Sequence, residues 1–514
     1  MTGAVTRRVW RAAAGVLVAT AVLVGSPVPG GAEGRAGGGP TLPAPSTAAA
    51  TADVDVAVTV ALEVDVAGSY EGSLANGTSW IAEVPDGWNG TLLLFSHGYL
   101  PSFIGAPNLP ALSPDPATAE ALLERGYGLV GSSYAAAGWA LPTAPQDQLD
   151  SLAAAVDRIG REPDRVLAYG SSMGGLVTAK LIEASDVFDG ALPMCGIVGG
   201  GLTLNNYQLD GGHAVDVLLA PDVAIQLVDF ASWGEAFTSS QQLVDAVTAA
   251  QDTPEGRART ALVAALYQVS TRVAGEEPPA RHDWEAMEHN QYRNLTAIIP
   301  FVLPGRVDIE AAAGGNASWN EGVDYRRLLR RSVDRRQVEA LYRRAGLDLD
   351  ADLRLLTATA TADVAVDGGA VDSLVDSSVP TGAIDIPVLT LHTVGDSLVP
   401  VQHEVGYADR VAEAGGRRWL RQAFVDRAGH CTFTPAEIVA AVETLDARVE
   451  SGRWGRTTRP GVLQRRAEAT GLGEAAFVGE PAGLELLGDR PPPDGAPCRR
   501  PPWGRRDGVT SGCR

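Results

Sequence analysis

The stretch Tyr169-Gly-Ser-Ser-Met-Gly-Gly-Leu176 carries the strongest fold signal in this chain of 514 residues. It follows the apolar run Val166-Leu167-Ala168, which is typical of a short buried strand, and it precedes a segment with the composition of a helix. Residues 170–174 have the form G-x-S-x-G. In that pattern the central residue lies on a tight strand-to-helix turn with its hydroxyl exposed. The stretch therefore predicts Ser172 as a nucleophile, although a glycine-rich turn that only allows close strand–helix packing has the same form.

Short apolar strands alternate with helices on both sides of this turn. The expected strands are 54–66, 73–84, 91–95, 127–132, 165–169, 191–194, 388–392 and 419–425. The expected helices are 116–125, 148–159, 173–184, 401–414 and 435–450. This spacing is typical of parallel β-α-β units. The sequence therefore predicts an α/β fold with a mostly parallel central sheet flanked by helices.

Residues 196–383 interrupt this alternation. They contain helix-like segments at 240–250, 257–270 and 323–344 and several tryptophans, so we interpret them as a mainly helical insertion between the sixth and seventh strand positions. The expected organisation of the chain is a signal peptide (1–32), a disordered linker (33–53), the first part of the core (54–195), the insertion (196–383), the second part of the core (384–454) and a C-terminal tail (455–514). We expect the tail, rich in Arg, Gly and Pro, to be poorly packed.

The N-terminus has the layout of a secretory signal peptide. Arg7, Arg8 and Arg11 precede an apolar run at 12–24, and small residues follow. That run is shorter than the ~20 residues of a spanning helix, so an uncleaved anchor is the less favoured alternative. The formal charge of −21 argues against nucleic acid and anionic membranes as partners. We expect a secreted protein without stable membrane insertion after cleavage, and nothing in the sequence indicates its oligomeric state.

The chain has four cysteines, Cys195, Cys431, Cys498 and Cys513. An even number in an exported chain favours disulfides, and three pairings are possible. Cys498 and Cys513 would close a loop within the tail, which leaves Cys195 with Cys431. There is no C-x-x-C motif and no histidine pair at ligand spacing, so we expect no metal site.

A serine nucleophile needs a base and an acid that orients the base. Among seven histidines, His430 lies in a loop between the last expected strand and the last expected helix, at the same sheet edge as Ser172. Asp396 follows strand 388–392 and reaches that edge too. The order Ser172, Asp396, His430 is typical of one class of hydrolase. A structural loop histidine, an Asp turn residue, and Asp426 as the rival acid are the alternatives.

The oxyanion that forms during acyl transfer needs backbone N–H donors. One donor is expected from Met173, directly after the serine. The other is expected from the loop that follows strand 91–95, where Tyr99 is our choice and Leu100 the alternative. This chemistry requires no metal and no organic cofactor.

Four motifs occur in order: Ser-His-Gly-Tyr at 96–99, Gly-Ser-Ser-Met-Gly-Gly at 170–175, Gly-Asp-Ser-Leu-Val-Pro at 395–400 and Gly-His-Cys-Thr-Phe-Thr at 429–434. Together they resemble secreted bacterial α/β-hydrolases, on the serine-esterase side that includes extracellular esterases and polyester depolymerases. The resemblance covers about 73–195 and 384–450. It implies an α/β-hydrolase fold, an acyl-enzyme intermediate, and a small or polymeric ester as substrate. A cysteine beside the base departs from most members.

The resemblance also implies that the insertion is a cap over Ser172. Phe230, Trp233, Phe237 and Tyr267 could line an acyl pocket, although each is more readily explained as part of the cap's own core. A serine peptidase with a gating cap and a non-catalytic binding protein on a hydrolase scaffold are the alternative functions. A carboxylate at position 172 would be expected for haloalkane or epoxide hydrolysis, so those reactions are disfavoured.

Overall fold

The computed structural model describes residues 66–362 and 368–490, all of which belong to one compact unit. The predicted signal peptide, the linker and most of the strand expected at 54–66 lie outside the described residues, as do Cys498 and Cys513. No helix within the described ranges is both long enough and apolar enough to cross a membrane.

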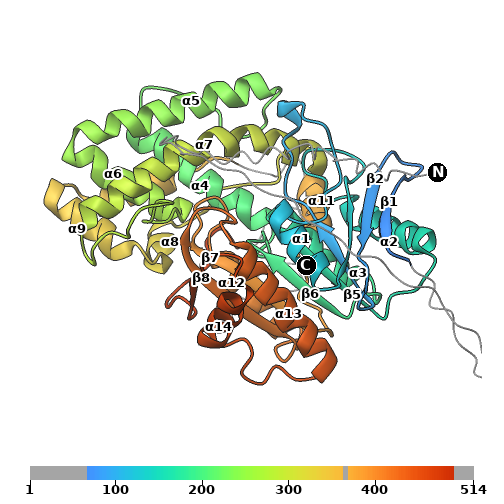
Figure 1. Ribbon diagram of the computed structural model, residues 1–514. Coiled ribbons are helices and arrows are strands. Elements are labelled where there is room, and N and C mark those ends of the chain that lie inside the picture. Colours follow the sequence, from blue (N-terminus) through green and yellow to red (C-terminus); the bar gives the residue numbers. More distant parts are fainter. Residues whose placement is uncertain (1–65, 363–367, 491–514) are drawn as a thin grey trace, which may run out of the picture. The chain divides into compact units, whose positions relative to one another are not determined.

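One mixed sheet runs through the described part of the chain (Figure 1). Its strands are β1 (Gly68–Ser73), β2 (Ser79–Val84), β3 (Thr91–Ser96), β4 (Gly128–Ser132), β5 (Arg165–Ser171), β6 (Gly190–Met194), β7 (Val388–Gly395), β8 (Leu420–Ala428) and β9 (Phe477–Val478). They lie in the order β1-β2-β4-β3-β5-β6-β7-β8-β9. The six strands from β4 to β8 in this order are parallel, while β1, β2 and β9 are antiparallel to their neighbours. The predicted mostly parallel α/β sheet is confirmed.

Helices cover both faces of the sheet because the central strands are apolar on both sides. In β3, Leu92 and Leu94 pack in one core cluster, whereas Leu93 and Phe95 pack in another, as the two-residue period of a strand requires. The first cluster includes side chains of α2 (Ala144–Ile159), α3 (Met173–Ala184) and α12 (Gln402–Glu413). The second includes α1 (Pro116–Glu124) and α13 (Pro435–Ser451). The sheet is therefore buried on both faces.

The chain between β6 and β7 is mainly helical, as predicted. It forms α4 (Gly201–Leu219), α5 (Trp233–Ala249), η2 (Ala250–Asp252), α6 (Pro254–Tyr267), α7 (Trp284–Ala313), α8 (Tyr325–Arg331), α9 (Arg335–Ala345), α10 (Leu349–Thr359) and α11 (Gly368–Ser378). Residues from Ala214 to Ala360 build a core of their own. Helix α4 joins the two regions, because Leu204 and Tyr207 pack in the sheet core and Val215 packs in the insertion core.

The single helix expected at 323–344 is wrong. Two helices, α8 and α9, occupy this segment, and Ser332, Val333 and Asp334 separate them. The Ser332 hydroxyl accepts a hydrogen bond from the Asp334 backbone N–H, which favours a turn over a continuous helix. Helices α4, α7, α10 and α11 were not predicted.

The expectation of a poorly packed tail is wrong for residues up to 490. Helix α14 (Pro460–Thr470) packs on the sheet core through Leu463 and Ala467. Farther along, Leu487 is buried, and its backbone N–H donates to Gln268 of the insertion at 3.0 Å. Arg490 pairs with buried Asp210 of α4 at 2.6 Å. The tail therefore covers both the sheet core and the insertion.

Replacing Leu487 with alanine tests this packing. The side chain is 1% exposed, and truncating a buried leucine typically costs about 2–5 kcal/mol. We expect the free energy of unfolding in urea to fall by an amount in that range. Leu355→Ala is the matched control, because Leu355 is 44% exposed and surface changes stay within about 0.5 kcal/mol. Equal midpoints for the two variants would contradict a structural role for the tail.

Candidate active site

Ser172 lies on a strained turn between β5 and α3. Its backbone has φ 60° and ψ −123°, a conformation that residues other than glycine rarely adopt. Such strain persists only where the surrounding structure enforces it, and it is concentrated at functional sites. The turn places the hydroxyl at the N-terminal end of α3, at the carboxyl edge of the sheet.

The two glycines of the G-x-S-x-G motif allow this turn to form. A Cβ on Gly174 would lie 1.9 Å from the Ser96 carbonyl oxygen, and a Cβ on Gly170 would lie 2.4 Å from the Gly174 carbonyl oxygen. Neither position can hold a larger residue without backbone movement. The glycines therefore bring α3 against the end of β3 and fix the position of Ser172.

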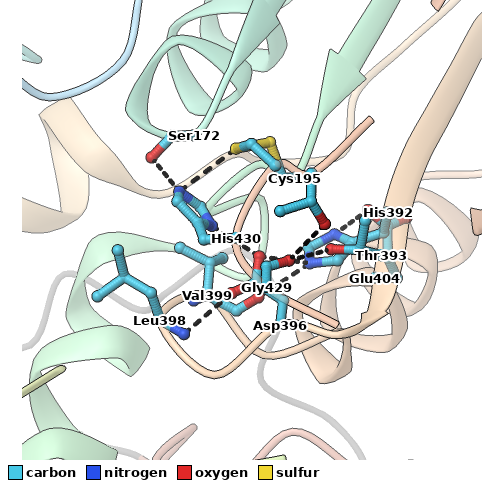
Figure 2. The surroundings of a disulfide bond; sticks show 12 residues. Ser172, Cys195, His392, Thr393, Asp396, Leu398, Val399, Glu404, Gly429 and His430 are labelled. Atoms are coloured by element: carbon cyan, nitrogen blue, oxygen red, sulfur yellow. Dashed lines mark hydrogen bonds and ion pairs between the residues drawn. A yellow bond between two sulfur atoms is a disulfide. The ribbon is translucent and has the colours of Figure 1, made fainter. Parts of the chain in front are cut away.

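The structure brings Ser172, His430 and Asp396 together (Figure 2). His430 Nε2 lies 2.8 Å from Ser172 Oγ, and His430 Nδ1 lies 2.6 Å from Asp396 Oδ2. Asp396 is 2% exposed, while Ser172 and His430 are partly accessible. The imidazole can thus accept a proton from the serine hydroxyl and hold its other N–H against a buried carboxyl group.

Asp396 is also a turn residue, as the alternative explanation required. Its Oδ1 accepts the backbone N–H groups of Leu398 and Val399, both at 2.9 Å. That leaves Oδ2 for His430. The two roles are compatible because they use different oxygens of one carboxyl group.

The loop that carries His430 is fixed to the end of β7. The Gly429 N–H donates to the Gly395 carbonyl at 3.1 Å, and the Thr393 hydroxyl donates to the Gly429 carbonyl at 2.8 Å. Gly429 has φ 99°, which favours glycine. These contacts set the distance between the Asp396 turn and the His430 loop.

A disulfide joins Cys195, directly after β6, to Cys431, directly after His430. Cys431 Sγ lies 3.4 Å from His430 Nε2. The ligand atoms of these three residues lie within 4.8 Å of one another, as a metal site would need. However, both sulfurs are in the disulfide and supply no thiolate for a metal. The cluster therefore fixes the histidine loop to the strand beside it.

The expected oxyanion donors lie on either side of the serine. Met173 is the first residue of α3, so its N–H has no acceptor within the helix. On the other side, a Cβ on Gly98 would lie 3.4 Å from Ser172 Cβ, which places the chain before Tyr99 against the serine. The position is consistent with a donor from Tyr99, which stays a prediction.

Tyr99 is anchored to the helical insertion. Its hydroxyl donates to Asp308 Oδ2 of α7 at 2.5 Å, and the Ser102 N–H donates to the same oxygen at 3.0 Å. Burial and the Asp308 carboxylate raise the pKa of Tyr99, so the phenol remains a neutral donor. Asp308 was not predicted, because no sequence pattern relates α7 to the loop after β3.

Aromatic side chains surround Tyr99. The ring of Phe301 on α7 lies 5.6 Å from the Tyr99 ring in an edge-on arrangement, and that of Trp139 lies 6.5 Å away. Neither residue was predicted. They place apolar surface beside the segment that contacts Ser172.

The four aromatic residues expected in an acyl pocket have other surroundings. Phe230 and Tyr267 are buried in the core of the insertion. Trp233 and Phe237 are exposed on α5, and the Phe237 ring packs against Phe103 of η1 (Ser102–Ile104) at 5.3 Å. The structure therefore favours the explanation that was already preferred for the buried pair.

The competing candidates have separate partners. His97 stacks on the Tyr134 ring at 4.1 Å and is buried, which lowers its pKa. Asp426 pairs with Arg272 at the protein surface. Neither contact involves Ser172 or His430.

The strand order and the strained serine turn define the α/β-hydrolase fold, and the chain is a hydrolase of this class. No protein-family model matches the chain. It is 30% identical to an o-phthalyl amidase of Xanthobacter agilis over 438 residues, which are 79% of this chain and 93% of that relative. The chain belongs to the family of that amidase.

Two solved structures illustrate the shared fold. An esterase from Aspergillus oryzae is 14% identical, with 75% of this chain and 80% of that chain covered and a TM-score of 0.37. A proline iminopeptidase from Mycobacterium smegmatis is 12% identical, with 78% and 99% covered and a TM-score of 0.30.

Gly174→Ala tests the close approach of α3 to β3. The new Cβ would overlap the Ser96 carbonyl, and such overpacking costs about 1–3 kcal/mol or more. We expect a matching loss of unfolding free energy in urea. Gly369→Ala on α11 is the control, since a Cβ there meets nothing within 4 Å. Unchanged stability of Gly174→Ala would show that the backbone contact is not tight.

The paired replacement Cys195→Ser/Cys431→Ser tests the disulfide. Removing a bridge of this kind typically costs about 2–4 kcal/mol, so the urea midpoint should fall. A thiol reductant should lower the wild-type midpoint to the same value and leave the variant unaffected. A wild-type midpoint that does not respond to reductant would contradict the bond.

Proposed function

We propose that the protein hydrolyses carboxylic esters with Ser172 as nucleophile, His430 as general base and Asp396 as the acid that orients the base. The observation that carries this proposal is the continuous contact from Ser172 Oγ to His430 Nε2 at 2.8 Å and from His430 Nδ1 to Asp396 Oδ2 at 2.6 Å. The strained serine conformation supports it further.

In the first half of the reaction, Ser172 Oγ attacks the carbonyl carbon of the substrate. The serine proton passes to His430 Nε2, while Asp396 accepts the Nδ1–H and stabilises the imidazolium. The negative oxygen of the tetrahedral intermediate is bound by the N–H groups of Met173 and Tyr99. Each such donor is typically worth about 2.7–4 kcal/mol in the transition state.

The intermediate then collapses. His430 gives its proton to the leaving alcohol, and the acyl group stays on Ser172 as an ester. Water, activated by His430, attacks that ester in the second half of the reaction, and the acid product leaves. All proton transfers use the single imidazole, which is why its two nitrogens need fixed partners.

Amides of aromatic acids are the second candidate substrate class. The family relationship to an enzyme named as an o-phthalyl amidase favours it. The aromatic rings of Tyr99, Trp139 and Phe301 support an aromatic acyl group, since they gather beside the segment that contacts Ser172. An amide differs from an ester in its leaving group, so the same residues would act in both reactions.

We also propose that the protein is exported. The N-terminal pattern of arginines, a short apolar run and small residues supports export, and so does a disulfide, which persists in oxidising compartments.

A fluorophosphonate probe and Ser172→Ala test the nucleophile. We expect the probe to label Ser172 in the folded wild type, and we expect Ser172→Ala to lose labelling and about 10⁴–10⁶-fold of kcat. Ser171→Ala is the matched control, because the neighbouring hydroxyl has no hydrogen-bond partner among the described residues. Turnover by Ser172→Ala close to that of the wild type would refute the proposed role.

The leaving group decides between the two substrate classes. We expect turnover of p-nitrophenyl benzoate and related esters. A comparison with the p-nitroanilides of benzoic and phthalic acid then measures amide hydrolysis with the same acyl groups. Hydrolysis of the anilides at a kcat/KM comparable with the esters would favour the amide candidate.

A further inference from the structure

A second buried imidazole lies behind Asp396. His392 on β7 is 0% exposed. Its Nδ1 lies 3.1 Å from Glu404 Oε1, and its Nε2 lies 2.9 Å from the Val399 carbonyl oxygen (Figure 2). Both partners are acceptors, and a neutral imidazole has only one N–H. Only the protonated form satisfies both contacts.

Glu404 has the surroundings of an ionised carboxylate. It is 1% exposed on α12. Its Oε2 accepts the Thr390 hydroxyl and the side-chain amide of Gln422, the latter at 2.6 Å, and its Oε1 faces His392. Buried charges are tolerated when they are paired and hydrogen-bonded, as here. Burial lowers the pKa of His392, but the hydrogen bond and charge of Glu404 outweigh it and the net pKa is raised.

The pair meets the hydrolytic site at one oxygen atom. His392 Nε2 lies 3.8 Å from Asp396 Oδ2, the same oxygen that lies 2.6 Å from His430 Nδ1. Val399 links the two groups as well, because its N–H donates to Asp396 Oδ1 while its carbonyl faces His392. One carboxylate oxygen therefore lies between two imidazoles.

We propose that His392 is a positioning residue that remains protonated, is balanced by Glu404, and keeps Asp396 ionised while making His430 harder to protonate. A positive charge behind Asp396 stabilises the carboxylate and opposes a second imidazolium across the same oxygen. His430 then stays neutral, and thus able to act as a base, to lower pH. The consequence for activity rests on the proposed function, whereas the charge of His392 does not.

The other groups around His392 do not supply this charge. On α12, His403 accepts the Gly199 N–H at Nδ1, and burial, His392 and Arg410 lower its pKa, so it is neutral. Burial raises the pKa of Tyr207 on α4 and of Tyr407 on α12, which keeps both phenols neutral. Arg410 on α12 donates to the Val198 carbonyl, and β8 contributes the neutral Gln422.

The protonation state can be measured directly on the wild-type protein. Long-range ¹H–¹⁵N NMR of protein labelled with ¹⁵N-histidine distinguishes protonated from bare ring nitrogens. At pH 8 we expect both nitrogens of His392 to carry protons and only one nitrogen of His403 to do so. Loss of a signal in each single variant assigns the resonances. A bare nitrogen on His392 at pH 8 would overturn the proposal without any activity assay.

The pH dependence of ester hydrolysis measures the effect on His430. His392→Gln and Glu404→Gln both remove the imidazolium, the second by leaving His392 unpaired and neutral. Since His430 is then easier to protonate, the acid limb of the kcat/KM profile should move to higher pH by about 1 unit. The ratio of variant to wild-type kcat/KM should rise toward one in alkaline solution.

His403→Gln is the matched control. It removes a buried, hydrogen-bonded imidazole next to Glu404 but no charge, so it should lower stability and leave the acid limb in place. A uniform loss of activity at all pH values in His392→Gln would indicate a merely structural role and contradict the proposal. Turnover retained by Ser172→Ala would instead refute the proposed function and leave the NMR result standing.

Discussion

Parallel pairing of β5, β6, β7 and β8 is the constraint on which the whole site depends. Parallel strands all end at one edge of a sheet, so the loops after β5, β7 and β8 must meet there, although 258 residues of sequence separate Ser172 from His430. The pairing of Gly395 with Ala428 then sets the height of the acid turn against the histidine loop. The disulfide from the end of β6 adds a fourth strand to this arrangement.

The site was well predicted where its chemistry is local in sequence. The serine turn follows from glycines that permit backbone contacts closer than any Cβ allows, and that requirement is written in five consecutive residues. Asp396 and His430 follow strands whose apolar runs are short and clear. Their placement needs only the rule that parallel strands share an edge, so periodicity and turn chemistry were sufficient.

Other features could not be read from local patterns. Helix α7 runs for 30 residues through Pro300 and Pro304, which sequence rules treat as helix breakers. Helix α4 contains Gly211 and Gly212 at positions where a larger residue would meet Tyr267 or Leu227. The partners of Tyr99 and His392 come from elements distant in sequence, and His392 itself was predicted only as a core residue. Tertiary packing, not propensity, determines all of these.

The disulfide also has a consequence for how the protein is made. Cys195 and Cys431 are 236 positions apart, and the entire helical insertion lies between them. Cys195 therefore emerges from the ribosome long before its partner exists, and the bond can close only after β7 and β8 have joined the sheet. Oxidation thus becomes a late step of maturation, one that reports that both halves of the hydrolase core have been assembled around the insertion.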